Sequence, residues 1–433
     1  MQTDAGPWYR GITRYQWLVL VIAWLGWVFD IADSAIFALV KGPMLTEMIG
    51  KVQYDRIGKD IEANIQTLFL IGWSIGGLIF GILADRWGRT KVLILTILIY
   101  SAFTALTAGC HSVEQVTWLR FLAALGIGGE WAAGAALIAE TFPDKARAPA
   151  ASVLQTAAAV GPILAALGNQ LLQLGSADVQ QNSWRWLFVF GAIPAFITVI
   201  IRMKIKEPER VVRAEKRSDA GNLKTIFANP TYRRYAIVAI IIGVVGIAGA
   251  NNLTFWIPNF IKSASPGLSD AVIATRKSYV TYSMHIGTLL GVFFFPWLCQ
   301  KIGRRPSFAI FFVMSPIALA LLTYGNPGYQ QILFLAPLGM FFVIGLTSGY
   351  ALYFPELFPA HLRATGAGLA YNTGRVATAP MPKLTAALSD YFHGSISTGV
   401  LIGSAAYFIG LLALPFAPET KGKGLPDEAV GDR

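Results

Sequence analysis

The stretch ETFPDKARA at residues 140–148 returns 216 positions later as ELFPAHLRA at residues 356–364, with Glu, Phe, Pro, Arg and Ala in the same register. A second stretch repeats at almost the same offset, because the Gly-Arg pair of RWGRTK (86–91) recurs in KIGRRP (301–306). Matches in the same order and at nearly one spacing indicate that the chain is built from two similar halves.

The composition indicates a membrane protein. Hydrophobic residues make up 55% of the chain, charged residues only 14%, and the mean hydropathy is +0.54, whereas soluble proteins carry about 25% charged residues. A helix crosses a bilayer with about 20 apolar residues, and the apolar runs here are too long for barrel strands. We therefore expect an all-α integral membrane protein with twelve transmembrane helices near residues 15–40, 63–83, 92–110, 116–139, 150–172, 185–203, 233–262, 277–299, 307–324, 330–354, 364–388 and 396–417.

The basic residues predict the orientation of these helices. If both termini are cytoplasmic, 24 of the 35 Lys and Arg residues fall on the cytoplasmic side, 8 on the outer side and three inside spans. Cytoplasmic loops of membrane proteins carry such an excess. The same distribution explains the net charge of +11 without nucleic-acid binding. Cys110 and Cys299 fall on opposite sides of the membrane, which excludes a disulfide between them.

The longest hydrophilic segment, residues 204–232, divides the spans into six and six. We expect an N-terminal bundle over residues 1–203, a C-terminal bundle over 233–417 and a cytoplasmic tail over 418–433. Both halves begin on the same side, so the repeat is parallel, and transporters built from such repeats bind substrate near the bilayer midplane between the repeats.

Four motifs resemble those of the major facilitator superfamily. GILADRWGRTK (81–91) resembles its signature between spans two and three, and PETKGKG (418–424) is similar to the end of its sugar porters. RFLAALGIGGEW (120–131) and PELFPAHLRATGAG (355–368) most resemble the metabolite:proton and sialate/lactate:proton symporters. The resemblance covers nearly the whole chain and implies two six-helix bundles (N- and C-termini cytoplasmic) that rock around a central site.

The resemblance also implies that the loops carrying these motifs brace the two halves and control switching between states, and that they do not contact substrate. The residues that match these gating motifs are Gly81, Asp85, Arg86, Gly88, Arg89, Glu140, Arg147, Gly303, Arg304, Glu356 and Arg363.

Two carboxylates, Asp30 and Asp33, interrupt the apolar stretch WLGWVFDIADSAIFALV at residues 24–40. A charge at the bilayer centre costs about 2.5–3.5 kcal/mol on insertion scales, and like charges three residues apart on a helix disfavour ionisation of both. Asp33 and Arg120 lie about 9 Å and about 10 Å outward of the middle of their spans, at a common depth. We expect the three residues to couple transport to protons, and a purely structural salt bridge is the alternative. Where these symporters have Asp-Gly-Phe/Tyr-Asp, this chain has Asp-Ile-Ala-Asp.

Arg375 falls near the middle of the eleventh span, where its planar guanidinium is suited to a substrate carboxylate. Tyr371 and Asn372 are expected to line the same site, and an ion pair between Arg375 and Glu130 is the alternative. The remaining candidates for substrate contact are Glu130, Gln155, Asn251 and Asn252. Asn251 and Asn252 resemble a position that contacts substrate in sugar porters.

Other polar residues in spans have a structural interpretation. His285 is suited to packing as well as to titration near neutral pH, and Lys383 is expected to extend its ammonium group toward the membrane surface. The chain contains no nucleotide-binding loop, nucleophile elbow or metal-ligand cluster. We therefore expect a non-enzymatic transporter without a metal or other cofactor, driven by an ion gradient.

The combined prediction is a monomeric transporter of the cytoplasmic (inner) membrane that imports a small organic anion together with protons. Its partners are the substrate, protons and the lipid bilayer. A sugar or polyol:proton symporter, a uniporter and a non-transporting receptor or scaffold are the alternatives.

Overall fold

The structure is a computed structural model that describes residues 8–173, 182–203, 219–268, 270–323, 327–380, 384, 391 and 396–426. Every regular element within these ranges is a helix. The first half of the chain contains α1 (Arg14–Ile49), α2 (Lys51–Trp87), α3 (Arg89–Thr107), α4 (Val113–Thr141), α5 (Asp144–Gln155), α6 (Ala157–Gln173) and α8 (Ser183–Arg202). The second half contains α10 (Leu223–Ala228), α11 (Pro230–Ser263), α12 (Asp270–Ile302), α13 (Arg304–Thr323), α14 (Tyr329–Glu356), η1 (Ala360–Leu362), α15 (Arg363–Thr378), α17 (Ile396–Ser404), α18 (Ala406–Ala413) and η2 (Leu414–Phe416).

The described part of each of the twelve predicted spans is mainly helical, and within the described chain ten helices are long and apolar enough to cross a membrane. The eleventh predicted span is described as far as Thr378, where α15 ends, and most of its remaining residues lie outside the described ranges. The first two helices are longer than the predicted spans near 15–40 and 63–83. α1 continues to Ile49 and α2 begins at Lys51, so that only Gly50 separates them.

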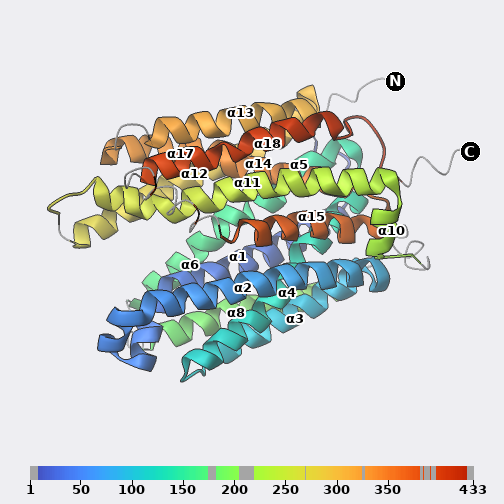
Figure 1. Cartoon of the computed structure of the whole chain (residues 1–433). Coiled ribbons are helices and arrows are strands. Elements are labelled where there is room, and N and C mark those ends of the chain that lie inside the picture. Colours follow the sequence, from blue (N-terminus) through green and yellow to red (C-terminus); the bar gives the residue numbers. More distant parts are fainter. Residues whose placement is uncertain are drawn as a thin grey trace, which may run out of the picture.

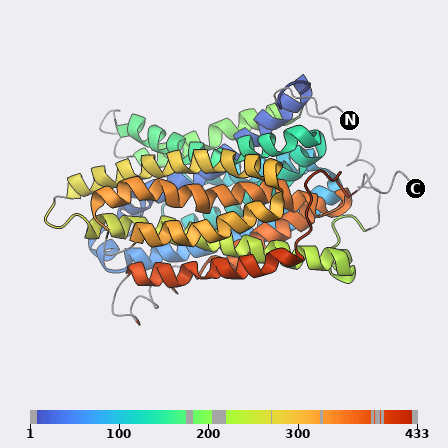
Figure 2. The ribbon, with the colours of Figure 1, turned by 90° about the horizontal axis from the view of Figure 1, so that it is seen from above.

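The helices run roughly parallel in two layers, and Figure 1 colours the first half of the chain blue to green and the second half yellow-green to red. Both ends of the described chain, the start of α1 and the segment after η2, lie at the end of the molecule that also holds α10 (Figures 1 and 2). α15 packs on α2, and α5 packs on α12 and α14. The main apolar core extends across both layers, because buried residues of α2 and α4 join one cluster with those of α14 and α15.

Glycines allow helices within each half to approach closely, and they do so at equivalent places. A Cβ on Gly76 of α2 would overlap the Leu125 carbonyl of α4, and a Cβ on Gly291 of α12 would overlap the Phe341 carbonyl of α14. Gly291 lies 215 residues after Gly76, the offset of the Gly-Arg repeat. Small residues permit such backbone contact between helices in membranes, so the repeat in sequence is also a repeat in packing.

Candidate functional site

Asp33 and Arg120 form a buried ion pair between α1 and α4. Arg120 Nη1 donates to Asp33 Oδ2 at 2.6 Å, and the Thr104 hydroxyl of α3 donates to Asp33 Oδ1 at 2.8 Å. Both charged side chains are almost completely buried. The predicted contact between Asp33 and Arg120 is therefore confirmed, whereas its role in proton coupling stays a prediction.

The Arg120 guanidinium also lies among three phenylalanine rings. Its central carbon is 4.5 Å from the ring centre of Phe69, 5.3 Å from that of Phe37 and 5.7 Å from that of Phe188. Aromatic faces stabilise a desolvated cation, so these rings lower the cost of burying the Arg120 guanidinium. Sequence reasoning missed these rings, because a phenylalanine in an apolar helix carries no sign of which residue it contacts.

Asp30 is fully buried on α1, one helical turn from Asp33. The rise along a helix places the two residues about 4.5 Å apart along the axis. On α1, Asp33 is thus paired with Arg120, and Asp30 lies on the same face of the helix, as the spacing predicted.

Arg375 lies between two aromatic side chains from different halves of the chain. Its guanidinium carbon is 3.6 Å from the ring centre of Trp73 on α2 and 4.8 Å from that of Tyr371 on α15, and Nη2 donates to the Tyr371 hydroxyl at 2.9 Å. Among the described residues Arg375 forms no ion pair. Glu130, the alternative partner, is buried and accepts a hydrogen bond from Thr96 of α3 at 3.3 Å.

An aromatic stack continues from Tyr371 to the first half of the chain. The Trp131 ring of α4 lies 3.9 Å from the Tyr371 ring, with an angle of 15° between the planes. Trp131 Nε1 donates to Gln155 Oε1 at 3.2 Å, and Gln155 Nε2 donates to the Thr347 carbonyl of α14 at 3.2 Å. Trp73 and Trp131 of the first half therefore enclose Arg375 and Tyr371 of the second half, in the order Trp73, Arg375, Tyr371 and Trp131, an arrangement that we call the central stack.

Two buried polar atoms beside the central stack have no hydrogen-bond partner in the part of the chain that the structure describes. They are the Asn372 Oδ1 acceptor and the Trp73 Nε1 donor. Asn372 Nδ2 donates to the Gly368 carbonyl at 2.8 Å, so only its oxygen is left over. Buried polar groups are normally hydrogen-bonded, and an unpaired donor, an unpaired acceptor and an arginine in one region favour a polar ligand there.

For several other predicted residues the structure describes only part of the surroundings or none. Asn251 and Asn252 belong to α11, but their side chains lie outside the described residues. Lys383 also lies outside them. His285 is half-buried on α12. Trp73 and Trp131 were not predicted as site residues. Their position near the middle of spans that also carry glycines and charged residues could have indicated them.

The first gating cluster joins the halves at the end of the molecule that holds both termini. Arg89 Nη2 lies 2.8 Å from Asp85 Oδ1 and 3.1 Å from Glu140 Oε1, and Arg363 Nη1 of the second half lies 2.7 Å from the same Glu140 oxygen. All four side chains are fully buried. Removing one member of such a buried network leaves an uncompensated charge and costs about 3–5 kcal/mol.

Asp85 also holds the start of α15. Its carboxylate accepts hydrogen bonds from the backbone N–H groups of Ala364 at 3.2 Å and Thr365 at 2.8 Å, and from the Thr365 hydroxyl at 2.6 Å. The first N–H groups of a helix lack partners within the helix and favour a negative charge. Gly81, one turn before Asp85, adds its carbonyl as an acceptor for the Thr365 hydroxyl at 3.4 Å.

A second gating cluster repeats the first one in the other half. Arg304 Nη2 lies 2.8 Å from Glu356 Oε1, and Arg147 of the first half lies 3.9 Å from the same oxygen. Gly88 and Gly303, which precede the two arginine-led helices, have φ values of 100° and 104° that favour glycine. Arg86 Nε donates to the Ala220 carbonyl at 3.0 Å. The structure thus brings together the gating residues, and their role in switching stays a prediction.

The C-terminal PETKGKG motif caps the start of α13. Glu419 Oε1 accepts from the Arg304 N–H and Oε2 from the Arg305 N–H, each at 3.0 Å. Burial alone raises the pKa of Glu419, but these N–H groups, that of Lys421 and the Arg304 charge outweigh it and lower the pKa below its usual value.

Comparison with known proteins agrees with this architecture. The family model of the Major Facilitator Superfamily matches residues 17–382. The cis,cis-muconate transport protein of Acinetobacter baylyi is 30% identical over 83% of this chain and 86% of its own, and the sialic acid transporter of Escherichia coli is 27% identical over 97% and 98%. The solved structure of a proton:xylose symporter superimposes with a TM-score of 0.76 at 19% identity, covering 96% of this chain and 99% of that one. The chain therefore belongs to the Major Facilitator Superfamily and is a multi-pass membrane transporter of metabolites, not an enzyme.

Proposed function

We propose that the protein is a proton-coupled symporter of a small organic anion, most simply a planar carboxylate. The observation that carries the proposal is the half-buried Arg375, which has no carboxylate partner in the described chain and lies against Trp73. A guanidinium binds a carboxylate through two parallel hydrogen bonds. The flat rings on either side of Arg375 favour a flat ligand, which can stack on them.

The relatives support the anionic class. One is named for cis,cis-muconate, one for sialic acid and one, of Acinetobacter baylyi, for niacin. All three compounds are carboxylic acids, and muconate and niacin are planar and conjugated. Asn372 Oδ1 and Trp73 Nε1 supply an acceptor and a donor for the remaining polar atoms of such a ligand.

The Asp33–Arg120 pair supports the coupling to protons. A proton on Asp33 removes its charge, and Arg120 then loses the only carboxylate with which it pairs in the described residues. The network of Thr104 and the phenylalanine rings would rearrange around the neutral acid. A buried switch of this kind links protonation to helix packing between α1 and α4. No cofactor is needed for this step, because the proton gradient supplies the free energy.

We further propose that the end holding both termini faces the cytoplasm, as the basic residues favour. The two gating clusters join the halves at that end, which corresponds to a state closed to the cytoplasm. Opening requires residues 1–203 and 233–417 to separate there as two bundles, with 204–232 as the linker, and a monomer is sufficient for this motion.

Uptake into proteoliposomes of the purified protein tests the proposal. Uptake of labelled muconate is measured with unlabelled nicotinate, lactate, xylose or a polyol as the competitor. Each measurement is made with and without a proton gradient directed into the liposomes, with the outside more acidic. We expect competition from carboxylates and accumulation only with the gradient. Competition by neutral sugars alone would overturn the proposal that the substrate is an anion. Uptake that neither accumulates substrate nor depends on the pH gradient would overturn the proposed coupling to protons.

A further inference from the structure

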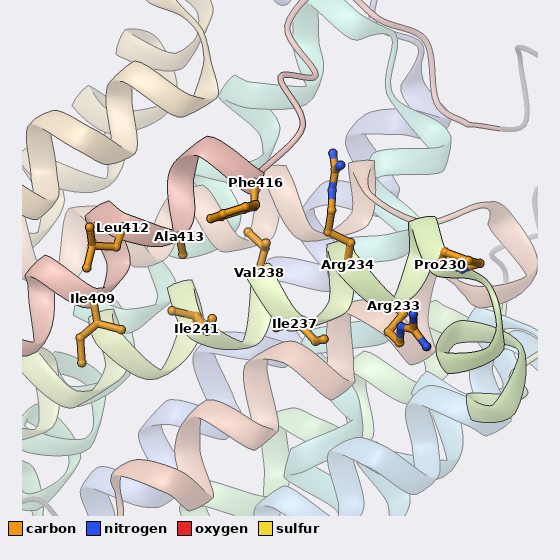
Figure 3. A pocket seen from close by; sticks show the side chains of 10 residues that line it. All are labelled: Pro230, Arg233, Arg234, Ile237, Val238, Ile241, Ile409, Leu412, Ala413 and Phe416. Carbon is orange, nitrogen blue, oxygen red and sulfur yellow. The ribbon is translucent and has the colours of Figure 1, made fainter.

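A groove on the outside of the second half is lined by the start of α11, by α18 and by η2 (Figure 3). Its volume is about 460 Å³, within the range of about 300–1,000 Å³ that is typical of ligand sites. The residues that line it are Pro230, Arg233, Arg234, Ile237, Val238, Ile241, Ile409, Leu412, Ala413 and Phe416. We propose that this groove binds an anionic phospholipid, with its headgroup at the arginine end of the groove and an acyl chain along the apolar walls.

The charge of the groove favours an anion. Arg233 and Arg234 are both exposed, and none of the residues that line the groove is acidic. Within the described chain neither arginine forms an ion pair, and the only partner of Arg234 is the Tyr235 ring at 5.6 Å. Figure 3 shows the two guanidinium groups extending to different sides of α11 at one end of the groove. An anionic headgroup at this end of the groove would lie near charges that the described residues leave uncompensated.

The walls of the groove favour an acyl chain. Ile237, Ile409, Leu412 and Phe416 are 47%, 57%, 73% and 60% exposed. From Pro230 to Ile241 the helix rises about 17 Å, comparable to the roughly 15 Å of one hydrocarbon leaflet. The arginines lie at the end of the helix, where the headgroups are, and the apolar residues follow toward the membrane interior. Basic pockets between transmembrane helices bind anionic headgroups for the same reason.

The proposal is tested on the full-length protein in nanodiscs of phosphatidylcholine with and without phosphatidylglycerol. We expect phosphatidylglycerol to raise the melting temperature by mass action and to remain bound in native mass spectra. The double variant Arg233→Ala/Arg234→Ala is expected to bind it roughly thirtyfold more weakly, since each basic residue near an anionic surface contributes about a factor of five. The matched control, Lys224→Ala/Lys423→Ala, removes two exposed charges outside the groove and should bind as the wild type does.

A second pair of variants tests the apolar part. Ile237→Trp fills the groove, whereas Leu290→Trp places the same ring on the exposed face of α12. Only the former should reduce lipid retention, and all variants should melt like the wild type in pure phosphatidylcholine. Equal loss of lipid in the lysine control would overturn the proposal, because it would show a nonspecific charge effect. Equal stabilisation by inorganic phosphate would also overturn it, since a free-anion site needs no acyl chain.

Discussion

The guanidinium of Arg375 lies 3.6 Å from the centre of the Trp73 ring, although the two residues belong to different halves of the chain. A cation this close to an aromatic face is attracted by about 0.5–2 kcal/mol. The contact ties α15 to α2 at the level of Asn372 and Tyr371. If a ligand carboxylate binds Arg375 as proposed, it shares the guanidinium with Trp73, and occupancy of the site would then affect the contact between the halves.

Arg375→Ala is expected to weaken binding of the organic anion by roughly 10- to 150-fold, the usual effect of losing a hydrogen bond to a charged group. Arg375→Lys should retain part of the affinity, since lysine keeps the charge but not the planar fork. Isothermal titration of the purified protein measures both. Lys262→Ala, which removes an exposed charge from α11, should leave affinity unchanged. If Arg375→Ala binds every carboxylate as tightly as the wild type, the anion site lies elsewhere.

Asp33→Asn is expected to abolish accumulation driven by a pH gradient while leaving exchange of labelled for unlabelled substrate. An amide cannot take up the proton, but it still fits beside Thr104. Uptake and counterflow in the same proteoliposomes separate the two activities, and a variant that still accumulates substrate would remove Asp33 from the coupling step.

The same substitution should lower stability by about 3–5 kcal/mol, because Arg120 is left as a buried, unpaired charge. Replacing Arg120 by Gln in addition should recover part of the loss. A double-mutant cycle of melting temperatures measures this coupling. Additive effects of the two substitutions would mean that the ion pair contributes nothing to stability.

Glu140→Gln is expected to favour states in which the end holding both termini is open. The substitution removes the charge that Arg89 and Arg363 share. Spin labels at Lys145 and Lys301, on either side of the closed end, should show longer distances in this variant. Glu114→Gln changes an exposed carboxylate on the same helix and should leave the distances as they are.

Glu419 is expected to add stability that depends on pH. Its folded-state pKa is lowered, so the stabilisation is present at neutral pH, above the ordinary value of 4.5, and is lost as the pH falls through the lower folded-state pKa. Glu419→Gln should therefore melt earlier than the wild type at pH 7, and the difference should shrink below about pH 4.5. Melting curves from pH 7 to pH 3.5 measure it. A constant difference across that range would contradict the assignment.

The sequence predicted those features that depend on short stretches of the chain. Apolar run length predicted the helices, the repeated ExFPxxxRA motif predicted the gating residues, and common depth predicted the contact of Asp33 with Arg120. The central stack was only half predicted. Arg375 and Tyr371 share a helix face and could be recognised together, whereas Trp73 and Trp131 reach them from other helices across the two halves. Such contacts depend on helix rotation, which one sequence does not specify.

The contact between α2 and α4 sets the backbone spacing of two tryptophans in the central stack. Gly128 has no room for a Cβ because the Trp73 carbonyl occupies that space, and Trp131 follows three residues later on the same helix. Trp73 and Trp131 are thus attached to one rigid unit, while Arg375 and Tyr371 belong to another. If the two units move as proposed, the backbone spacing between the two tryptophans stays constant. A ligand that enters between them would then meet the same backbone spacing in every state of the proposed cycle.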